Sequence, residues 1–161
     1  MSGTISLNGE WDLAWAEGSP LLPPESAMSE SKGSKAFIKA AVPSPIHRVL
    51  MNAGLIDDPN IGLNSLKCRW VEEMFWIYRL EFEAPAEAAS VTSRLLFKLL
   101  ELESEVYLNG AKVGTHANAH RPARFDVTGK LKAGKNLLVV KLSSGLHSAA
   151  DKQGEGYCGG A

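Results

Sequence analysis

Apolar and polar residues alternate along several short stretches of the chain. The clearest stretch is residues 76–82, in which Trp76, Tyr78, Leu80 and Phe82 alternate with Ile77, Arg79 and Glu81. Successive side chains of a β-strand point to opposite faces, so this pattern predicts a strand with one buried face. Residues 10–15, 94–100, 124–127 and 136–142 show comparable apolar runs and predict further strands.

Two Asn-Gly pairs punctuate these runs and predict tight turns. Asn109 and Gly110 lie inside "VYLNGAKVG" (residues 106–114), and Asn8 and Gly9 separate "TISL" from "EWDLAW". Asparagine and glycine accept the positive φ that both central positions of a type I′ turn require. Both pairs therefore predict β-hairpins with antiparallel strands.

One stretch has the helical period instead. In "SPIHRVLMNAG" (residues 44–54), Ser44 is placed to cap a helix and Pro45 suits its first turn. The apolar stripe then consists of Ile46, Val49, Leu50 and Ala53, and it ends at Gly54. We expect one short amphipathic helix that covers an edge or an end of the sheet.

The remaining segments have neither period. Residues 16–35 and residues 57–66 are rich in Pro, Gly, Ser, Asn and charge, and they predict exposed loops. The last residues, 144–161, predict a loop or a disordered tail of a truncated chain. About six to nine short strands with one helix predict an all-β sandwich. We expect residues 1–161 to form a single domain with an ordered core at about 4–143.

Composition and charge exclude several classes of protein. With 45% hydrophobic residues and a formal charge of -1, the chain has the composition of a globular protein and lacks the basic surface of a nucleic-acid binder. No apolar run approaches the roughly 20 residues of a membrane span, and the N-terminus has no signal-peptide pattern, so the compartment stays open. Cys68 and Cys158 are too few for a disulfide framework and too far apart for a zinc motif.

Candidate catalytic and metal-binding residues are scarce. His116 and His120 lie more than about 10 Å apart on an extended chain, and no further ligands are evident near them. Adjacent Glu72 and Glu73 would point to opposite faces of a strand. Glu101 and Glu103 would share a face at roughly 6.5 to 7 Å, but any i, i+2 pair has that spacing. The sequence also lacks a nucleophile elbow and a glycine-rich phosphate loop, so we predict no catalytic residue, metal site or cofactor.

Aromatic residues offer a different chemistry, because their faces can stack on sugar rings. Trp11, Trp15, Trp76 and Tyr78 occupy alternating strand positions that predict burial in the core. Trp70 is the exception, because it borders the polar loop before the strongest strand.

Five segments together resemble a known family. They are "LNGEWDLAW", "VPSPIHRVLMNAGLIDDPNIGLN", "RWVEEMFWIYRLEF", "EVYLNGAKVG" and "RPARFDVTGKLKAGKNLLVV", and they span nearly everything from residue 7 to 142. Their order and spacing resemble the N-terminal domain of β-mannosidase-like enzymes of glycoside hydrolase family 2. The resemblance implies a jelly-roll β-sandwich of the galactose-binding-domain-like type, followed in the parent enzyme by immunoglobulin-like and TIM-barrel domains.

The resemblance also implies where the chemistry lies. In the family, two barrel glutamates hydrolyse the glycosidic bond with retention, and a barrel alone takes about 250 residues. This chain would then be non-catalytic by itself, and its partners would be the other domains of the enzyme and, weakly, a carbohydrate. The resemblance and the loop composition make Asp58, Asn60, Asn64 and Trp70 our candidates for the side that faces the substrate.

Several residues depart from the family pattern. Ser44, Asn60, Ile61 and Leu63 replace residues usual on the expected substrate side, and Ala123 stands at an often aromatic position. The resemblance therefore does not extend to mannose specificity. Two alternatives from other classes stay open, namely a free-standing carbohydrate-binding module and a structural packing domain that touches no sugar.

Overall fold

The computed structural model describes residues 3–17, 37–144 and 146. Its strands are β1 (Gly9–Glu17), β2 (Ile38–Val42), β3 (Met74–Ala84), β4 (Arg94–Phe97), β5 (Glu103–Leu108), β6 (Ala111–His116), β7 (Ala123–Asp126) and β8 (Gly134–Ser143). Its helices are α2 (Ile46–Asn52), the single turns α3 (Asn64–Lys67) and α4 (Trp70–Glu73), and the 3-10 turn η1 (Ala86–Ala89). The longest of these helices, α2, has seven residues, so none in the described part of the chain could cross a bilayer.

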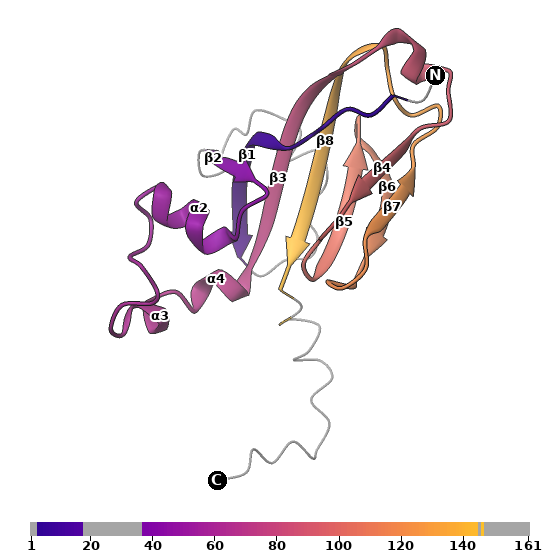
Figure 1. Ribbon diagram of the computed structural model, residues 1–161. Helices are drawn as coiled ribbons and strands as arrows, with labels where there is room; N and C mark the ends of the chain where they lie inside the picture. Colours follow the sequence, from indigo (N-terminus) through magenta and orange to yellow (C-terminus); the bar gives the residue numbers. More distant parts are fainter. Residues whose placement is uncertain (1–2, 18–36, 145, 147–161) are drawn as a thin grey trace, which may run out of the picture.

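The strands form two antiparallel sheets that pack as a sandwich. The larger sheet has six strands in the order β2-β1-β3-β8-β5-β6, and the smaller sheet pairs β4 with β7. In Figure 1 the small sheet lies over the β5 and β6 half of the large sheet, and α2, α3 and α4 lie toward its other side. The predicted all-β sandwich is therefore confirmed.

The core lies on the face of the large sheet that these elements cover. Its members include Leu13, Val106 and Leu138 from the large sheet, which are at most 1% exposed. Val127, which follows the small sheet, and Leu50 of α2 close the core from the other side. Burial of such side chains contributes about 1.5 to 3 kcal/mol each, which makes this face the main source of stability.

The alternation predicted in residues 76–82 is confirmed within β3. Trp76 and Tyr78 belong to the core, and Leu80 and Phe82 pack against it. Ile77 points to the opposite face, where it forms a second, smaller cluster with Tyr107 and Val139. The large sheet therefore buries apolar side chains on both faces near its centre.

The hairpin at Asn109 and Gly110 is also confirmed. Both residues have positive φ, 51° at Asn109 and 89° at Gly110, and they join β5 to β6. Asn109 does more than turn the chain, because its side chain donates to Lys130 O (3.0 Å) and to Asn136 Oδ1 (2.8 Å). Its own Oδ1 accepts from the backbone N–H of Leu137 at 3.0 Å.

Asn136 is the centre of this network and is only 2% exposed. Its Nδ2 donates to Lys132 O (2.7 Å) and Gly134 O (2.8 Å), and its Oδ1 accepts from Lys132 N (2.9 Å) as well as from Asn109. All of its side-chain hydrogen-bonding capacity is used, which offsets the cost of burying an amide. The network ties the β5–β6 turn to the connection between β7 and β8.

The second predicted hairpin, at Asn8 and Gly9, is wrong. Gly9 is the first residue of β1, with φ 141°, and it pairs with Val42 of β2 rather than with residues just before it. Residues 3–8 form no strand, and Leu7 O accepts a hydrogen bond from Trp11 Nε1 at 2.8 Å. The start of β1 therefore pairs with β2, which is distant in sequence, and not with the residues just before it.

The helix at residues 46–52 is confirmed, but its predicted cap is not. Pro45 occupies the N-cap position, and no side chain caps the helix there, so Ser44 does not have the predicted role. Val49 and Leu50 are buried as expected, while Ala53 follows the helix and is exposed. Among the segments predicted as loops, Ala16 and Glu17 belong to β1, and residues 18–36, 145 and 147–161, with Cys158, lie outside the described residues.

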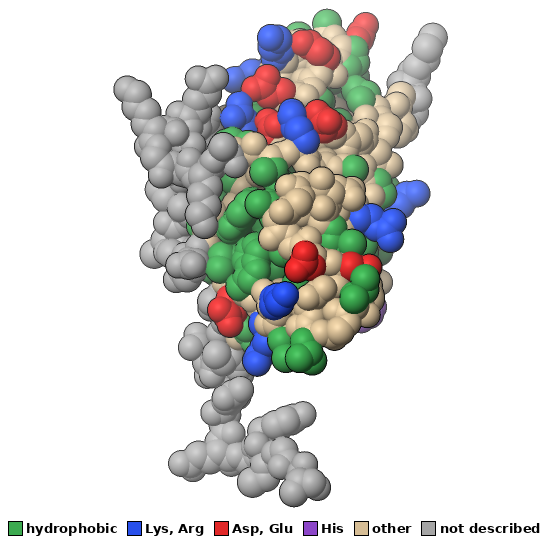
Figure 2. Space-filling model, turned by 90° about the vertical axis from the view of Figure 1, so that its left-hand side faces the viewer, with side chains coloured by type: hydrophobic (Ala, Val, Ile, Leu, Met, Phe, Trp, Pro, Cys, Tyr) green, Lys and Arg blue, Asp and Glu red, His purple; other side chains and the backbone are tan. Residues whose placement is uncertain are grey.

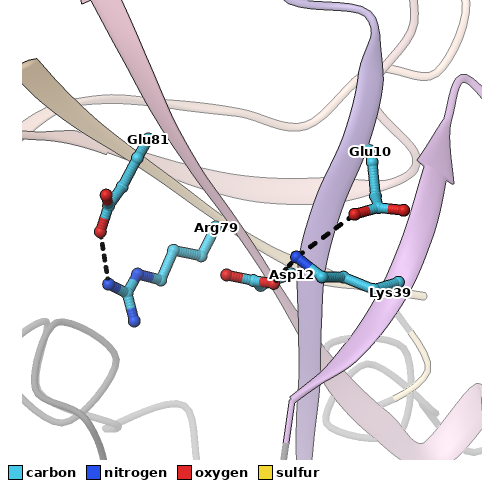
Figure 3. A network of polar contacts seen from close by, with 5 residues as sticks. All are labelled: Glu10, Asp12, Lys39, Arg79 and Glu81. Carbon is cyan, nitrogen blue, oxygen red and sulfur yellow. Dashed lines mark hydrogen bonds and ion pairs between the residues drawn. The ribbon is translucent and has the colours of Figure 1, made fainter.

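The outer face of β1, β2 and β3 carries a ladder of charged side chains. Lys39 lies 2.8 Å from Asp12 and 3.4 Å from Glu10, and Arg79 lies 2.9 Å from Glu81 (Figure 3). The hydrogen bond that Lys39 donates to Asp12, followed by the one that it donates to Glu10, raises the pKa of Lys39. Asp12 stands opposite both Lys39 and Arg79 in the sheet register, so opposite charges support the strand pairing.

A second polar cluster lies on the same face across β5, β6 and β8, around Glu105. Its carboxylate accepts from the Tyr107 hydroxyl (2.9 Å) and from Lys112, and Lys141 Nζ lies 3.8 Å away. Burial alone would raise the pKa of Glu105, but the hydrogen bonds from Lys112 and Tyr107 outweigh it and lower the pKa. Burial also raises the pKa of Tyr107, to about 12.

The lowered pKa of Glu105 predicts an acid-sensitive contribution to stability. Because the folded pKa lies below the unfolded value, the contribution is present above the unfolded pKa and is lost as the pH falls through the folded pKa. We expect Glu105→Gln to lower the free energy of unfolding at about pH 7 but to have little effect at about pH 3. Urea unfolding at both pH values, with the exposed Glu87→Gln as control, measures the difference. An equal loss at both pH values would contradict this assignment.

Candidate functional site

The loop that we predict to face a substrate contributes to the lining of a small cavity that is open to solvent. The cavity has a volume of about 180 Å³. It is lined by Gly54, Leu55, Ile56, Asp57, Asn64, Lys67, Cys68 and Trp70, which come from the end of α2, the following loop, α3 and the start of α4. Figure 2 shows the side of the molecule that carries α2 and α3, where hydrophobic side chains are interspersed with single charged ones.

Asp58 organises the loop behind this cavity. Its Oδ1 accepts from the backbone N–H and from Nδ2 of Asn60, both at 2.9 Å. Its backbone carbonyl accepts from Asn64 Nδ2 at 3.1 Å. A short polar side chain that bonds the backbone two residues on is the usual reason for Asp in such turns. Three of the four predicted loop residues, Asp58, Asn60 and Asn64, are therefore brought together.

Trp70, the fourth predicted residue, connects the cavity to the body of the domain. It is half-buried, and its ring lies 6.2 Å from that of Trp15 and 6.0 Å from that of Trp76. Trp15 and Trp76 lie 5.6 Å apart, so the three rings form one cluster. Trp76 is fixed by a hydrogen bond from Nε1 to Val71 O at 3.1 Å. Trp70, which lines the cavity, therefore packs against side chains of two strands, β1 and β3.

The structure divides the predicted residues into two groups. Asn64 and Trp70 line the cavity, whereas Asp58 and Asn60 do not line it and instead hold the loop in shape. Sequence reasoning missed Asp57, Lys67 and Cys68. Lys67 Nζ lies 3.6 Å from Asp57 Oδ2. Lys67 is the last residue of the α3 turn, which the sequence pattern did not predict. Cys68 is a free, buried cysteine, and no periodic signal marked it as a lining residue.

The carboxylates and histidines considered from the sequence are not gathered at this cavity. Glu72 and Glu73 lie in α4 rather than in a strand, which corrects the expected geometry. Glu103 begins β5, but Glu101 precedes the strand, so the two do not form an i, i+2 strand pair. His116 ends β6, where its Nε2 lies 2.7 Å from Asn118 O and 3.0 Å from Arg121 O. Within residues 3–17, 37–144 and 146, no three metal-ligating side chains come together.

The lining of the cavity combines polar and apolar groups. An amide, an ion pair and an indole ring there offer hydrogen bonds and an apolar face. One carboxylate, that of Asp57, lines the cavity. The arrangement can position a ligand or a neighbouring protein surface.

Comparisons with known proteins identify the family to which this domain is similar. Residues 27–157 match the family described as glycosyl hydrolase 2 galactose-binding domain-like. The chain is 35% identical to Beta-mannosidase B of Thermothelomyces thermophilus over 74% of its length, and 30% identical to Beta-mannosidase of Capra hircus over 88%. In each case it spans only 14% of the relative.

Solved structures extend the likeness to three dimensions. A Beta-D-Mannosidase from Dictyoglomus thermophilum matches 96% of the chain with a TM-score of 0.76 and 32% identity, and the match covers 17% of that enzyme. A beta-glucuronidase of Ruminococcus gnavus matches 86% of the chain with a TM-score of 0.60 and 24% identity, and it supports the fold alone. The family match covers most of the chain, and the curated relatives and the Dictyoglomus structure carry the same domain in β-mannosidases. The chain therefore belongs to the glycosyl hydrolase 2 galactose-binding domain-like family.

Proposed function

We propose that this chain is the non-catalytic, N-terminal, carbohydrate-binding-like domain of a β-mannosidase-like enzyme of glycoside hydrolase family 2. The full-length enzyme would hydrolyse terminal β-glycosidic bonds with retention. The observation that carries the proposal is the size of the match, because residues 27–157 match one family domain and the aligned part is only about one seventh of the β-mannosidases reported above. The two glutamates of the reaction would lie in the barrel of the parent enzyme.

Within that enzyme, we assign the loop of residues 54–70 to the substrate side. Asn64 and Trp70 offer an amide and an aromatic face on one cavity, and Asp58 holds the loop in shape. A cavity of about 180 Å³ is smaller than the roughly 300 to 1,000 Å³ of a complete ligand site. The loop would therefore supply one wall of a pocket whose remainder belongs to another domain.

The reading frame beyond Ala161 tests the proposal directly. We expect several hundred further residues that encode an immunoglobulin-like domain and a barrel with two glutamates at strand ends. The isolated chain should then hydrolyse no aryl β-mannoside, β-galactoside or β-glucuronide, while the full-length protein hydrolyses at least one. A stop codon soon after Ala161 would overturn the proposal. So would turnover by the isolated chain that disappears in Glu101→Gln or Glu103→Gln.

A free-standing carbohydrate-binding module is the second candidate, and the half-buried Trp70 on the cavity favours it. The two candidates differ in affinity. A shallow wall should bind sugars with a dissociation constant on the order of millimolar or weaker, equivalent to about -4 kcal/mol. Micromolar binding of a mono- or oligosaccharide to the isolated chain, measured by calorimetry, would favour the module instead.

The loop itself can be tested by Asn64→Ala in the full-length enzyme. We expect kcat/KM to fall about tenfold, because the variant removes an amide from the cavity and a hydrogen bond that shapes the loop. The free energy of unfolding of the isolated chain should change by no more than about 1 kcal/mol. Asn52→Ala, at the exposed end of α2, is the matched control and should leave kcat/KM unchanged. Full activity of the Asn64 variant would remove the loop from the substrate side.

A further inference from the structure

Antiparallel pairing brings several connections to one end of the sandwich. Trp76 near the start of β3 pairs with Leu142 near the end of β8, and Glu103 at the start of β5 pairs with Ser143. We call this the α4 end, because α4 leads directly into β3. The Asn109–Gly110 turn lies at the opposite end.

Large apolar side chains that stay exposed are concentrated at the α4 end. Among the described residues, six of the ten lie in its connections, namely Ile61, Leu63, Leu66, Leu99, Leu102 and Leu146. Leu63 is 75% exposed and Leu99 is 64% exposed. Figure 1 places α3 and α4 on one side of the end of β8 and the β4–β5 connection on the other. The apolar side chains therefore flank the place where the chain leaves the sheet.

This distribution is that of an interface and not of an ordinary surface. Single exposed leucines are common on monomers, but their collection at one end marks a contact site. Exposed charged residues lie beside them in the chain, namely Lys67, Arg69, Glu72, Lys98 and Glu101. Apolar contacts combined with polar groups are the usual anatomy of a protein interface.

The position of β8 identifies the occupant. Ser144 follows β8 and donates from Oγ to Glu72 O of α4, so the chain leaves the sheet beside the exposed leucines. The chain also spans only 14% of the β-mannosidases it matches. We infer that the α4 end packs through these leucines and Ile61 against an apolar surface of the polypeptide that follows this domain in the parent enzyme. The inference rests on the proposed function and adds the residues through which the domain is held.

Hydroxyl-radical footprinting of the isolated chain and of the full-length protein tests this interface. We expect labelling of Leu63, Leu66 and Leu99 to fall about fivefold or more in the full-length protein, because a packed contact excludes the solvent radical. Ile5 and Val91, which are 49% and 48% exposed outside the α4 end, are the controls and should be labelled equally in both. Equal labelling of all five residues would overturn the inference.

A charge variant gives an independent test. In the full-length protein, Leu63→Asp with Leu66→Asp should loosen the domain and increase proteolytic cleavage between it and the next domain severalfold, because a carboxylate resists burial in an apolar contact. Val91→Asp should leave cleavage unchanged. Unchanged cleavage in the Leu63 and Leu66 variant would contradict the interface.

The outcomes separate this inference from the proposed function. A full-length glycosidase whose α4 end stays fully labelled would refute the interface and leave the proposed function standing. A reading frame that ends soon after Ala161 would refute both. Concentration-dependent protection of the same leucines in the isolated chain, with a dimer in sedimentation experiments, would assign the α4 end to a second copy and overturn the inference.

Discussion

Replacing both turn residues, as Asn109→Val with Gly110→Val, is expected to lower the free energy of unfolding by about 3 to 6 kcal/mol. The φ values of 51° and 89° lie in the left-handed region, where a β-branched residue costs about 1 to 3 kcal/mol. The variant also loses three side-chain hydrogen bonds of Asn109, including the one in which Asn109 Oδ1 accepts from the Leu137 N–H. Thermal and urea unfolding of the isolated chain measure the loss, and an insoluble product is the extreme form of the same result.

A gentler substitution separates the two causes. Asn109→Gly keeps the positive φ but removes the side chain, so it should cost less than the double valine variant and more than nothing. Asn109→Asp keeps the acceptor for Leu137 and loses both donated hydrogen bonds. A double valine variant with the stability of the parent chain would show that the β5–β6 turn is not what holds this end of the sheet.

Asn136→Ala should be the most damaging single substitution of a polar residue, with a loss of about 3 to 4 kcal/mol. Asn136 is 2% exposed, and the alanine leaves Lys132 and Gly134 carbonyls and the Lys132 N–H without their partner. Each buried polar group left without a partner costs about 1 to 3 kcal/mol. For a domain of this size we expect a fall in Tm of roughly 6 to 15 °C, measured by thermal unfolding of the isolated chain.

The matched control for this substitution is Asn52→Ala, at an exposed position at the end of α2, which should change stability by less than about 0.5 kcal/mol. A cycle that combines Asn109→Ala with Asn136→Ala tests the coupling. Because the two amides bond to each other at 2.8 Å, the double variant should lose less than the sum of the single variants. Strict additivity would mean that the two residues act separately.

Most of the sheet was predictable from the sequence because its two faces differ. Trp76 and Tyr78 repeat with a period of two, and that period survives folding whenever one face is buried. The turn at Asn109 was predictable for a local reason, since few residue types accept its φ. The pairing of β1 with β2 was not, because Gly9 and Val42 are brought together only by the complete sheet.

The hydrogen-bond network of Asn109 and Asn136 could not be predicted from the sequence, for the same reason. Nothing about Asn136 in "GKNLLVV" distinguishes it from a surface asparagine, and its burial depends on the approach of the Asn109 turn. The helical turns α3 and α4 were also missed, because each has only four residues and presents no full period.

The candidate site was predictable as a loop but not as a cavity. The family resemblance and the loop composition pointed to Asp58, Asn60, Asn64 and Trp70, and three of these do bond to one another. Which of these residues lines the cavity depends on the α3 turn, because Asn64 and Lys67 of α3 are lining residues. Their role toward a substrate stays a prediction.

The tryptophan cluster beside the cavity gives the domain an optical property. Trp15, Trp70 and Trp76 lie within 5.6 to 6.2 Å of one another, which is close enough for their excited states to couple. Such coupling produces a paired positive and negative band in circular dichroism, and its sign and size depend on the angles between the rings. Since Trp70 also lines the cavity, a ligand that binds there and rotates the Trp70 ring would alter this band. The domain therefore carries its own spectroscopic reporter, with no dye or label attached.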